Sequence, residues 1–194
     1  ISLIKAMHHS QTKNLIFSSS ATVYGEPQYL PIDENHNLVV NSPYGLTKKI
    51  SEEIFNNYCE HNAKAKVISL RYFNPVGAHQ SGLIGERPNG TPNNLMPYVS
   101  QVACGERPFV KIFGNKYQTK DGTGVRDYIH IEDLADGHIA ALNYINTMDE
   151  SFNVFNLGTG RGYSVLDVLE EYSNVSGNRI STKVDKARPG DVAE

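Results

Sequence analysis

A tyrosine and a lysine stand four residues apart, Tyr44 and Lys48, in a segment that begins with Pro43. On a helix, side chains at this spacing leave the same face about one turn apart. A phenol is a poor base at neutral pH because it loses its proton only at about pH 10, but a neighbouring ammonium favours the phenolate. The pair therefore has the chemistry of a general base assisted by its neighbour. Taken alone, this spacing more often marks the solvated edge of a helix. The surrounding residues therefore determine whether the pair is interpreted as catalytic.

Apolar runs and helical stripes alternate along the chain and indicate the elements that would position this pair. An apolar run at 14–19 ends in three serines, and the segment 43–61 carries Ile50, Ile54 and Tyr58 in a stripe expected to face a core. The same reasoning expects a helix at the start of the chain, strands at 67–72, 109–113, 126–130 and 153–157, and helices at 95–104, 131–145 and 164–173. This alternation predicts a parallel sheet covered on both faces, with ligands at the carboxyl ends of its strands.

Two glycine-rich segments invite a functional interpretation. Residues 74–92 are rich in Gly, Pro and Asn and are longer than most connections inside domains, which predicts a binding loop. Residues 158–162 (GTGRG) suggest a phosphate loop, but the position of a third glycine in a dinucleotide fingerprint is taken by Tyr163. We therefore interpret the second segment as an ordinary strand-to-helix turn.

Composition excludes several classes of partner and site. The 194 residues carry 18 basic and 21 acidic side chains, a net charge of −3, which argues against a nucleic-acid partner. No run of about eighteen apolar residues occurs, so no membrane partner is expected. Cys59 and Cys104 stand in unrelated segments, which favours a reduced, cytoplasmic protein. The seven histidines show no metal-ligand spacing, so we expect no metal site.

Six ordered groups of residues resemble a known superfamily. Residues 18–25 (SSSATVYG), 42–48 (SPYGLTK) and 71–77 (RYFNPVG) resemble the extended short-chain dehydrogenase/reductase superfamily. Residues 92–98 (PNNLMPY), 121–130 (DGTGVRDYIH) and 188–191 (RPGD) narrow the resemblance to the UDP-glucose 4-epimerase family. The match is ordered and covers nearly the whole chain, which makes it far more specific than any single motif.

The resemblance implies an isomerase of galactose metabolism that interconverts UDP-galactose and UDP-glucose with tightly bound NAD. Tyr44 would take the proton of the sugar 4-hydroxyl while hydride passes from C4 to NAD, and the 4-keto sugar would turn over before it is reduced on its other face. Lys48 would bind the nicotinamide ribose and assist Tyr44, and Ser20 would hydrogen-bond the reacting oxygen. The residues implied to contact the cofactor are Ser18, Ser20, Tyr44, Lys48, Tyr72 and Phe73.

A substrate that must rotate cannot be held at its reacting ring, so the remote nucleotide has to supply the binding energy. Arg126 and Arg188 carry planar charged groups suited to phosphate oxygens, and Asp191 would accept from a ribose hydroxyl. The residues implied to contact the substrate are Ser20, Tyr44, Asn74, Asn93, Asn94, Leu95, Lys111, Ile112, Phe113, Arg126, Arg188 and Asp191.

The resemblance also predicts the architecture. We expect an α/β chain in which a partial Rossmann-type, doubly wound parallel sheet (1–76 and 127–157) binds NAD and a smaller α/β domain (77–126 and 158–194) binds the UDP-sugar. The full-length protein is expected to be a homodimer, with the helix at 43–61 among the contacts. Because the family's N-terminal glycine-rich loop and its C-terminal end have no counterpart here, we expect this segment alone to bind NAD weakly and to have little activity.

Other functions are compatible with part of this pattern. A sugar-nucleotide 4,6-dehydratase also uses the Tyr and Lys pair, but it needs acid and base groups to eliminate water, and residues 20–22 (SAT) supply no carboxylate. A UDP-glucuronate decarboxylase or epimerase is a weaker alternative. A non-catalytic protein that binds UDP-sugars is the alternative from a different class.

Overall fold

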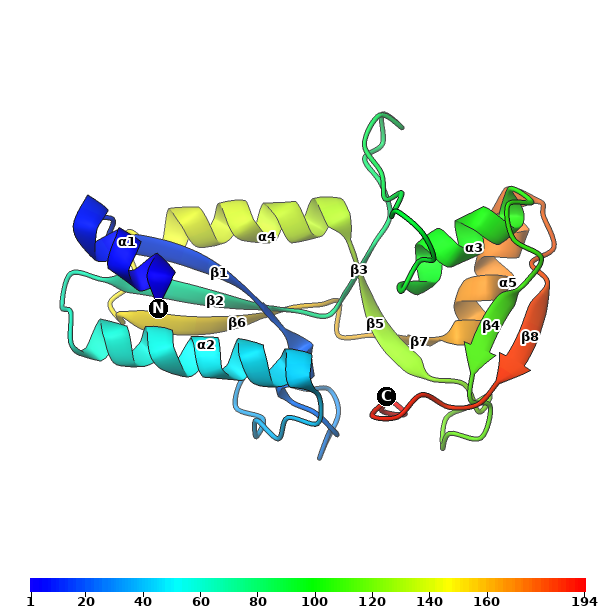
Figure 1. Cartoon of the computed structure of the whole chain (residues 1–194), viewed down its shortest axis with the longest axis horizontal. Coiled ribbons are helices and arrows are strands. Elements are labelled where there is room, and N and C mark those ends of the chain that lie inside the picture. The colour runs from blue at the N-terminus through cyan, green and yellow to red at the C-terminus, as the bar shows by residue number, and fades with distance from the viewer. The chain divides into compact units, whose positions relative to one another are not determined.

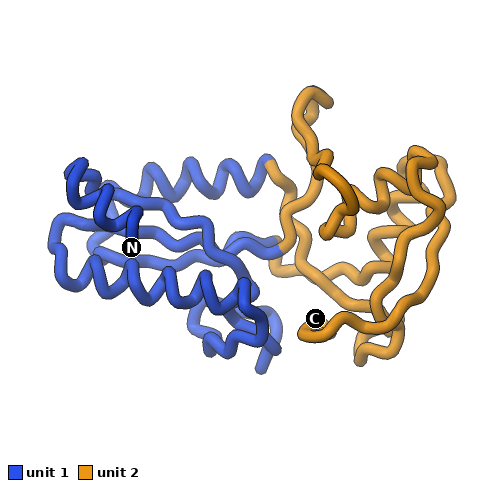
Figure 2. The backbone as a smooth tube through the Cα atoms, in the orientation of Figure 1, with its two compact units in different colours: residues 1–73, 132–158 blue, residues 74–131, 159–194 orange.

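The computed structural model describes residues 1–194, which divide into two compact units (Figure 1). Unit 1 consists of residues 1–73 and 132–158, and unit 2 consists of residues 74–131 and 159–194 (Figure 2). The chain therefore leaves each unit and later returns to it. None of the helices is long and apolar enough to cross a membrane.

Unit 1 is built on a parallel sheet in the order β1-β2-β6, formed by β1 (Asn14–Ser20), β2 (Lys66–Tyr72) and β6 (Phe152–Leu157). Helix α1 (Ser2–Ser10) precedes β1, and α2 (Pro43–Glu60) and α4 (Ile131–Tyr144) lie on opposite sides of the sheet (Figure 1). Alternate residues of β2 explain this arrangement, because Val67 packs with the α2 residues and Ile68 with the α4 residues. The predicted parallel sheet, covered on both faces, is confirmed.

Helix α2 begins where its sequence predicts, but it buries a different face. The Ser42 side chain accepts a hydrogen bond from the Gly45 amide at 3.1 Å, and Pro43 opens the first turn. The prediction that Ile50 faces the core is wrong, because Ile50 is 43% exposed. The buried residues are Gly45, Glu52, Phe55 and Cys59. A carboxylate therefore lies on the buried face, which an apolar pattern cannot reveal.

Unit 2 contains two small sheets. Strand β5 (Val125–His130) pairs in parallel with β3 (Asn74–Val76) and antiparallel with β7 (Gly162–Ser164). Strands β4 (Val110–Phe113) and β8 (Thr182–Asp185) form a parallel pair. Helices α3 (Leu95–Ala103) and α5 (Val165–Ser176) contribute to its core, which consists of Val99, Val110, Ile112, Leu169 and Ile180.

Three of these short strands depart from the sequence expectations. The segment predicted to be wholly a binding loop starts with β3, the predicted strand-to-helix turn is followed by β7, and β8 was not expected. The sheet around β5 is mixed, although strand-helix alternation suggested only parallel pairing. Strands of three or four residues give too few alternating positions to produce a recognisable pattern.

Asp121 fixes the start of α5 from a neighbouring turn. Its carboxylate accepts from the Thr123 amide at 2.8 Å, from Thr123 Oγ1 at 2.7 Å and from Ser164 Oγ, and Ser164 in turn caps α5. Burial alone would raise the pKa of Asp121, but these hydrogen bonds outweigh it and hold the pKa below the ordinary value.

Asp121→Asn is expected to lower the free energy of unfolding at neutral pH by on the order of 1 kcal/mol, because it removes the charge that the three donors stabilise. Since the folded-state pKa is lowered, this stabilisation is present above the unfolded pKa and is lost as the pH falls through the folded pKa. Urea unfolding of both proteins at neutral and acidic pH measures it. A stability difference that stays constant with pH would contradict this account.

Candidate functional site

The carboxyl end of β1 carries the three serines that the sequence singled out. Ser20 caps the 3-10 turn η1 (Ala21–Val23), because its Oγ accepts from the Thr22 amide at 3.2 Å and from Thr22 Oγ1 at 3.0 Å. The Oγ of Ser19 is buried and has no hydrogen-bond partner. The Ser20 hydroxyl is thereby held at the carboxyl end of the strand, where ligands of parallel sheets bind.

Helix α2 brings the tyrosine and the lysine to this same end of β1. Lys48 Nζ donates to the Ser18 carbonyl oxygen at 2.8 Å and lies 5.4 Å from the centroid of the Tyr44 ring. The Tyr44 side chain is 56% exposed, so its phenol is available to a ligand. The structure thus gathers Tyr44, Lys48, Ser18 and Ser20 in one region of unit 1. An ammonium beside a phenol there is suited to proton transfer.

Tyr72 and Phe73 follow at the end of β2. Tyr72 Oη is hydrogen-bonded to Ser18 Oγ at 2.7 Å and to Nε2 of His138, a residue of α4 that the sequence analysis did not select. Burial raises the pKa of Tyr72, and the neighbouring Tyr44 adds to the effect. The Phe73 amide donates to the Leu157 carbonyl at 3.0 Å, which fixes the backbone at this position.

Unit 2 contains a pocket of about 510 Å³ that collects most of the residues predicted to bind the substrate. The predicted residues that line it are Asn74, Asn93, Asn94, Leu95, Lys111, Phe113, Arg126, Arg188 and Asp191. Its charged lining consists of three cationic side chains and one carboxylate. Lys111 is paired with Asp185 at 2.9 Å, so the two arginines are the cations that favour an anionic ligand. Ser20 and Tyr44, also predicted to contact the substrate, belong to unit 1.

Two arginines of this pocket are held by different contacts. Arg126 Nη1 donates to the Val125 carbonyl at 2.6 Å, and its Nη2 pairs with the Asp191 carboxylate at 3.3 Å. The guanidinium of Arg188 lies 3.8 Å from the centroid of the Phe113 ring, within cation–π distance. Both heads are thereby oriented before any ligand arrives, and each retains donors for phosphate oxygens.

Neighbouring residues of the pocket differ from the sequence expectation in detail. The Ile112 side chain is buried in the core of unit 2 and is not among the pocket's lining residues, so its backbone is the part available to a ligand. Tyr117, which the sequence analysis did not select, lines the pocket and has a buried Oη without a hydrogen-bond partner. No pattern in the sequence distinguishes Tyr117 from the other tyrosines.

The backbone amides of the glycine-rich segment after β6 donate hydrogen bonds within the protein. The Asp127 carboxylate accepts from the Thr159 amide at 2.8 Å, from Thr159 Oγ1 at 2.8 Å and from the Gly160 amide at 2.7 Å. Amides that could have held a phosphate are therefore occupied by a carboxylate of the protein.

A larger pocket of unit 2, about 790 Å³, lies against α5 and includes none of the predicted site residues. No three His, Cys, Asp or Glu side chains gather as metal ligands would.

The first comparison with known proteins concerns the family. Residues 1–158 match the family described as the NAD dependent epimerase/dehydratase family. The chain belongs to this family. The matched range contains every residue that gathers at the end of β1 and most of the pocket of unit 2.

Individual members of the NAD-dependent epimerase/dehydratase family are similar over essentially the whole chain. The UDP-glucose 4-epimerase of Homo sapiens is 54% identical over 100% of this chain and 56% of its own length, and that of Drosophila melanogaster is 52% identical over 98% and 55%. A solved UDP-glucose 4-epimerase from Bifidobacterium longum, in complex with NAD+ and UDP, is 49% identical with a TM-score of 0.94 and covers 98% of this chain and 57% of that one. The chain spans about half the length of the curated relatives it matches.

Proposed function

We propose that the protein containing this chain is a UDP-glucose 4-epimerase, which interconverts UDP-galactose and UDP-glucose with bound NAD. The observation that carries the proposal is the similarity, at 52–54% identity over nearly all of this chain, to proteins named UDP-glucose 4-epimerase. The geometry of each unit supports the chemistry.

The residues at the end of β1 fit the nicotinamide end of NAD and the reacting carbon of a sugar. An exposed phenol, an ammonium and a serine hydroxyl lie at this end of β1, and the buried Ser19 Oγ has no partner within the protein. NAD, when bound, accepts a hydride from C4 of the sugar and later returns it. Tyr44 removes the proton of the 4-hydroxyl, Lys48 stabilises the phenolate, and Ser20 hydrogen-bonds the oxygen that becomes a carbonyl.

The pocket of unit 2 supports the binding of the UDP group. Arg126 and Arg188 supply positive charge for a diphosphate, and Phe113 supplies an aromatic face for the uracil. Asp191 accepts from a ribose hydroxyl. Binding through this remote group leaves the sugar ring free to turn over between the two hydride transfers.

We further propose that the protein is a cytoplasmic homodimer. Leu46 and Ile50 of α2 are 49% and 43% exposed, which supports a contact between copies through this helix. Both cysteines are free, which is consistent with a reducing compartment. Light scattering of the full-length protein measures the oligomeric state, and a monomer would contradict the proposal.

The reaction is tested with the purified full-length protein and UDP-galactose. Formation of UDP-glucose with no added NAD, and without loss of water or carbon dioxide, supports the epimerase. Turnover of UDP-glucuronate instead of UDP-galactose would favour the decarboxylase class, and saturable UDP binding without turnover of either sugar would favour a binding protein.

A further inference from the structure

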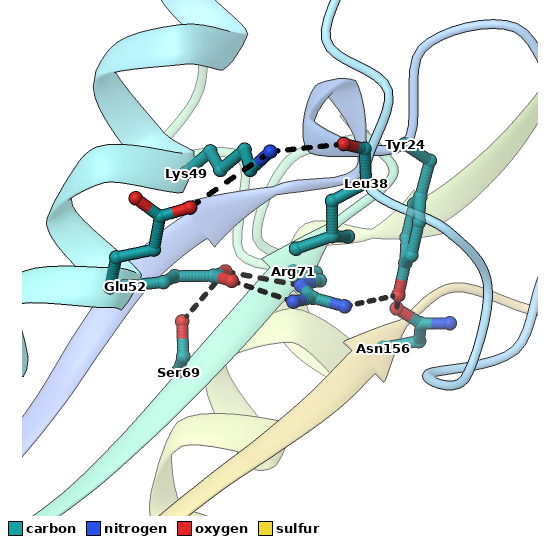
Figure 3. Close-up of polar contacts among 8 residues, drawn as sticks. Tyr24, Leu38, Lys49, Glu52, Ser69, Arg71 and Asn156 are labelled. Atoms are coloured by element: carbon teal, nitrogen blue, oxygen red, sulfur yellow. Dashed lines mark hydrogen bonds and ion pairs between the residues drawn. The ribbon is translucent and has the colours of Figure 1, made fainter. Parts of the chain in front are cut away.

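A buried ion pair joins the catalytic helix to the sheet of unit 1. The side chains of Arg71 in β2 and Glu52 in α2 are 4% and 5% exposed. Arg71 Nη2 donates to Glu52 Oε2 at 2.6 Å and Arg71 Nε to Glu52 Oε1 at 3.1 Å, and Ser69 Oγ adds a hydrogen bond of 3.0 Å to the same carboxylate (Figure 3). Burial alone would lower the pKa of Arg71, but the hydrogen bonds to its partners raise it, so the guanidinium stays charged.

The remaining donor of Arg71 connects to a second segment. Arg71 Nη1 donates to Tyr24 Oη at 2.9 Å, and Tyr24 Oη donates to Asn156 Oδ1 at 2.6 Å (Figure 3). Asn156 in β6 is fixed in turn, because its side-chain amide donates to the Ile32 carbonyl at 3.1 Å. Tyr24 is completely buried. Burial raises its pKa, while the charge of Arg71 opposes the shift.

Arg71 therefore contacts both segments that carry the reacting groups. Glu52 lies one helical turn beyond Lys48 on α2, and Tyr24 follows directly after η1, the turn that Ser20 caps. The same two segments also touch each other, because a Cβ at Gly45 would lie 2.6 Å from the Thr22 carbonyl oxygen. A shift of α2 along or around its axis would break the contacts of Arg71.

Stability alone does not account for this arrangement. A buried ion pair loses the hydration of both charges, and replacing such a pair by apolar residues of similar volume is often neutral or stabilising. An apolar pair at Glu52 and Arg71 would fill the same space, but it would lack the directional bonds that fix helix, strand and turn together. Catalysis is sensitive to the loss of these directional bonds, since a displacement of the reacting groups by about 1 Å can reduce the rate about a hundredfold.

We propose that Arg71, with Glu52 and Tyr24, is a positioning residue that sets the placement of Tyr44 and Lys48 relative to Ser20. This inference rests on the proposed function and deepens it. Arg71 does not touch the substrate in this account and acts only through α2 and η1.

The informative variant is the double substitution Glu52→Met/Arg71→Met in the full-length protein, because each single change to Met leaves a buried charge unpaired. We expect a melting temperature close to that of the wild type, a KM for UDP-galactose within about threefold, and a kcat at least tenfold lower. Amide hydrogen exchange provides a readout independent of turnover, and we expect faster exchange at Gly45 and Thr22. The matched control is Arg87→Met/Glu106→Met, which removes an exposed ion pair by the same two substitutions and should change none of these quantities.

Two further variants keep the proposal falsifiable if the double variant does not fold. Arg71→Lys keeps the charge without the planar group, and Tyr24→Phe keeps the ion pair but removes the hydrogen bond between Arg71 and the residue that follows η1, so both should lower kcat more than they change KM. A normal kcat in the folded double variant, or in both of these variants if it unfolds, would overturn the proposal. An inactive wild type would instead overturn the proposed function, and exchange at Gly45 and Thr22 would then still report whether Arg71 orders the two segments.

Discussion

Tyr44→Phe in the full-length protein is expected to lower kcat for UDP-galactose by roughly a hundredfold to ten-thousandfold, because it removes the phenolate oxygen that takes the proton of the sugar in the proposed reaction. The ring remains, so the exposed side chain keeps its contacts and the stability should change by no more than about 0.5 kcal/mol. Affinity for UDP should be unchanged, since the cationic pocket lies in unit 2. Steady-state kinetics and calorimetry with UDP measure the two effects separately.

The matched control for this change is Tyr58→Phe on the same helix. Tyr58 accepts a hydrogen bond from the Asn62 side chain and lies near the far end of α2 from Tyr44. The same loss of a hydroxyl there should leave kcat within about twofold, because the Tyr58 ring keeps its packing against the core of unit 1 and lies away from the site. If Tyr44→Phe retained a tenth of the wild-type kcat or more, Tyr44 could not be the general base.

Arg126→Met is expected to weaken UDP binding by roughly tenfold to a hundredfold, which corresponds to the loss of a hydrogen bond to a charged group. In the wild type the Asp191 carboxylate lies 3.3 Å from this guanidinium, so the change leaves it without its partner in the pocket proposed to receive a diphosphate. Repulsion between these negative charges adds to the loss. Adding Asp191→Asn to Arg126→Met should therefore recover part of the affinity.

Calorimetric titration with UDP checks this prediction. Arg87→Met serves as the control, because the Arg87 side chain is 87% exposed and lies outside the pocket. The affinity of the wild type should fall with added salt, and that of Arg126→Met should fall less steeply, since fewer charges attract the diphosphate. An unchanged affinity in Arg126→Met would remove Arg126 from the binding site.

The sequence predicted the elements with long, regular patterns. The strands ending at Ser20 and Tyr72 and the helix from Pro43 were found within one residue or so, because apolar runs, the Ser42 cap and Pro43 are local signals. The three-residue strands β3 and β7 were missed, since their pairing with β5 depends on distant residues. Local pattern therefore predicted unit 1 better than unit 2.

Only part of the candidate site could be predicted, again because the sequence reveals local spacing but not contacts between distant residues. Tyr44 and Lys48 are four residues apart, so helical geometry alone places them together. Glu52 and Arg71 lie in different elements, and charged residues are almost always on the surface unless paired, so neither could be recognised as buried from sequence. The buried hydroxyl of Tyr117 likewise depends on the tertiary fold.

The interleaving of the two units has a consequence for synthesis on the ribosome. Strand β2 ends at Tyr72 and its partner β6 begins only at Phe152, after the chain has passed through most of unit 2. Unit 2 in turn requires β7 and β8, which follow β6. At about 5–20 residues per second, β2 waits on the order of ten seconds for its neighbour. Unit 1 therefore cannot complete its sheet before β6 has been synthesised, and unit 2 cannot complete its own sheets before β7 and β8, so each unit waits for a segment that lies beyond part of the other.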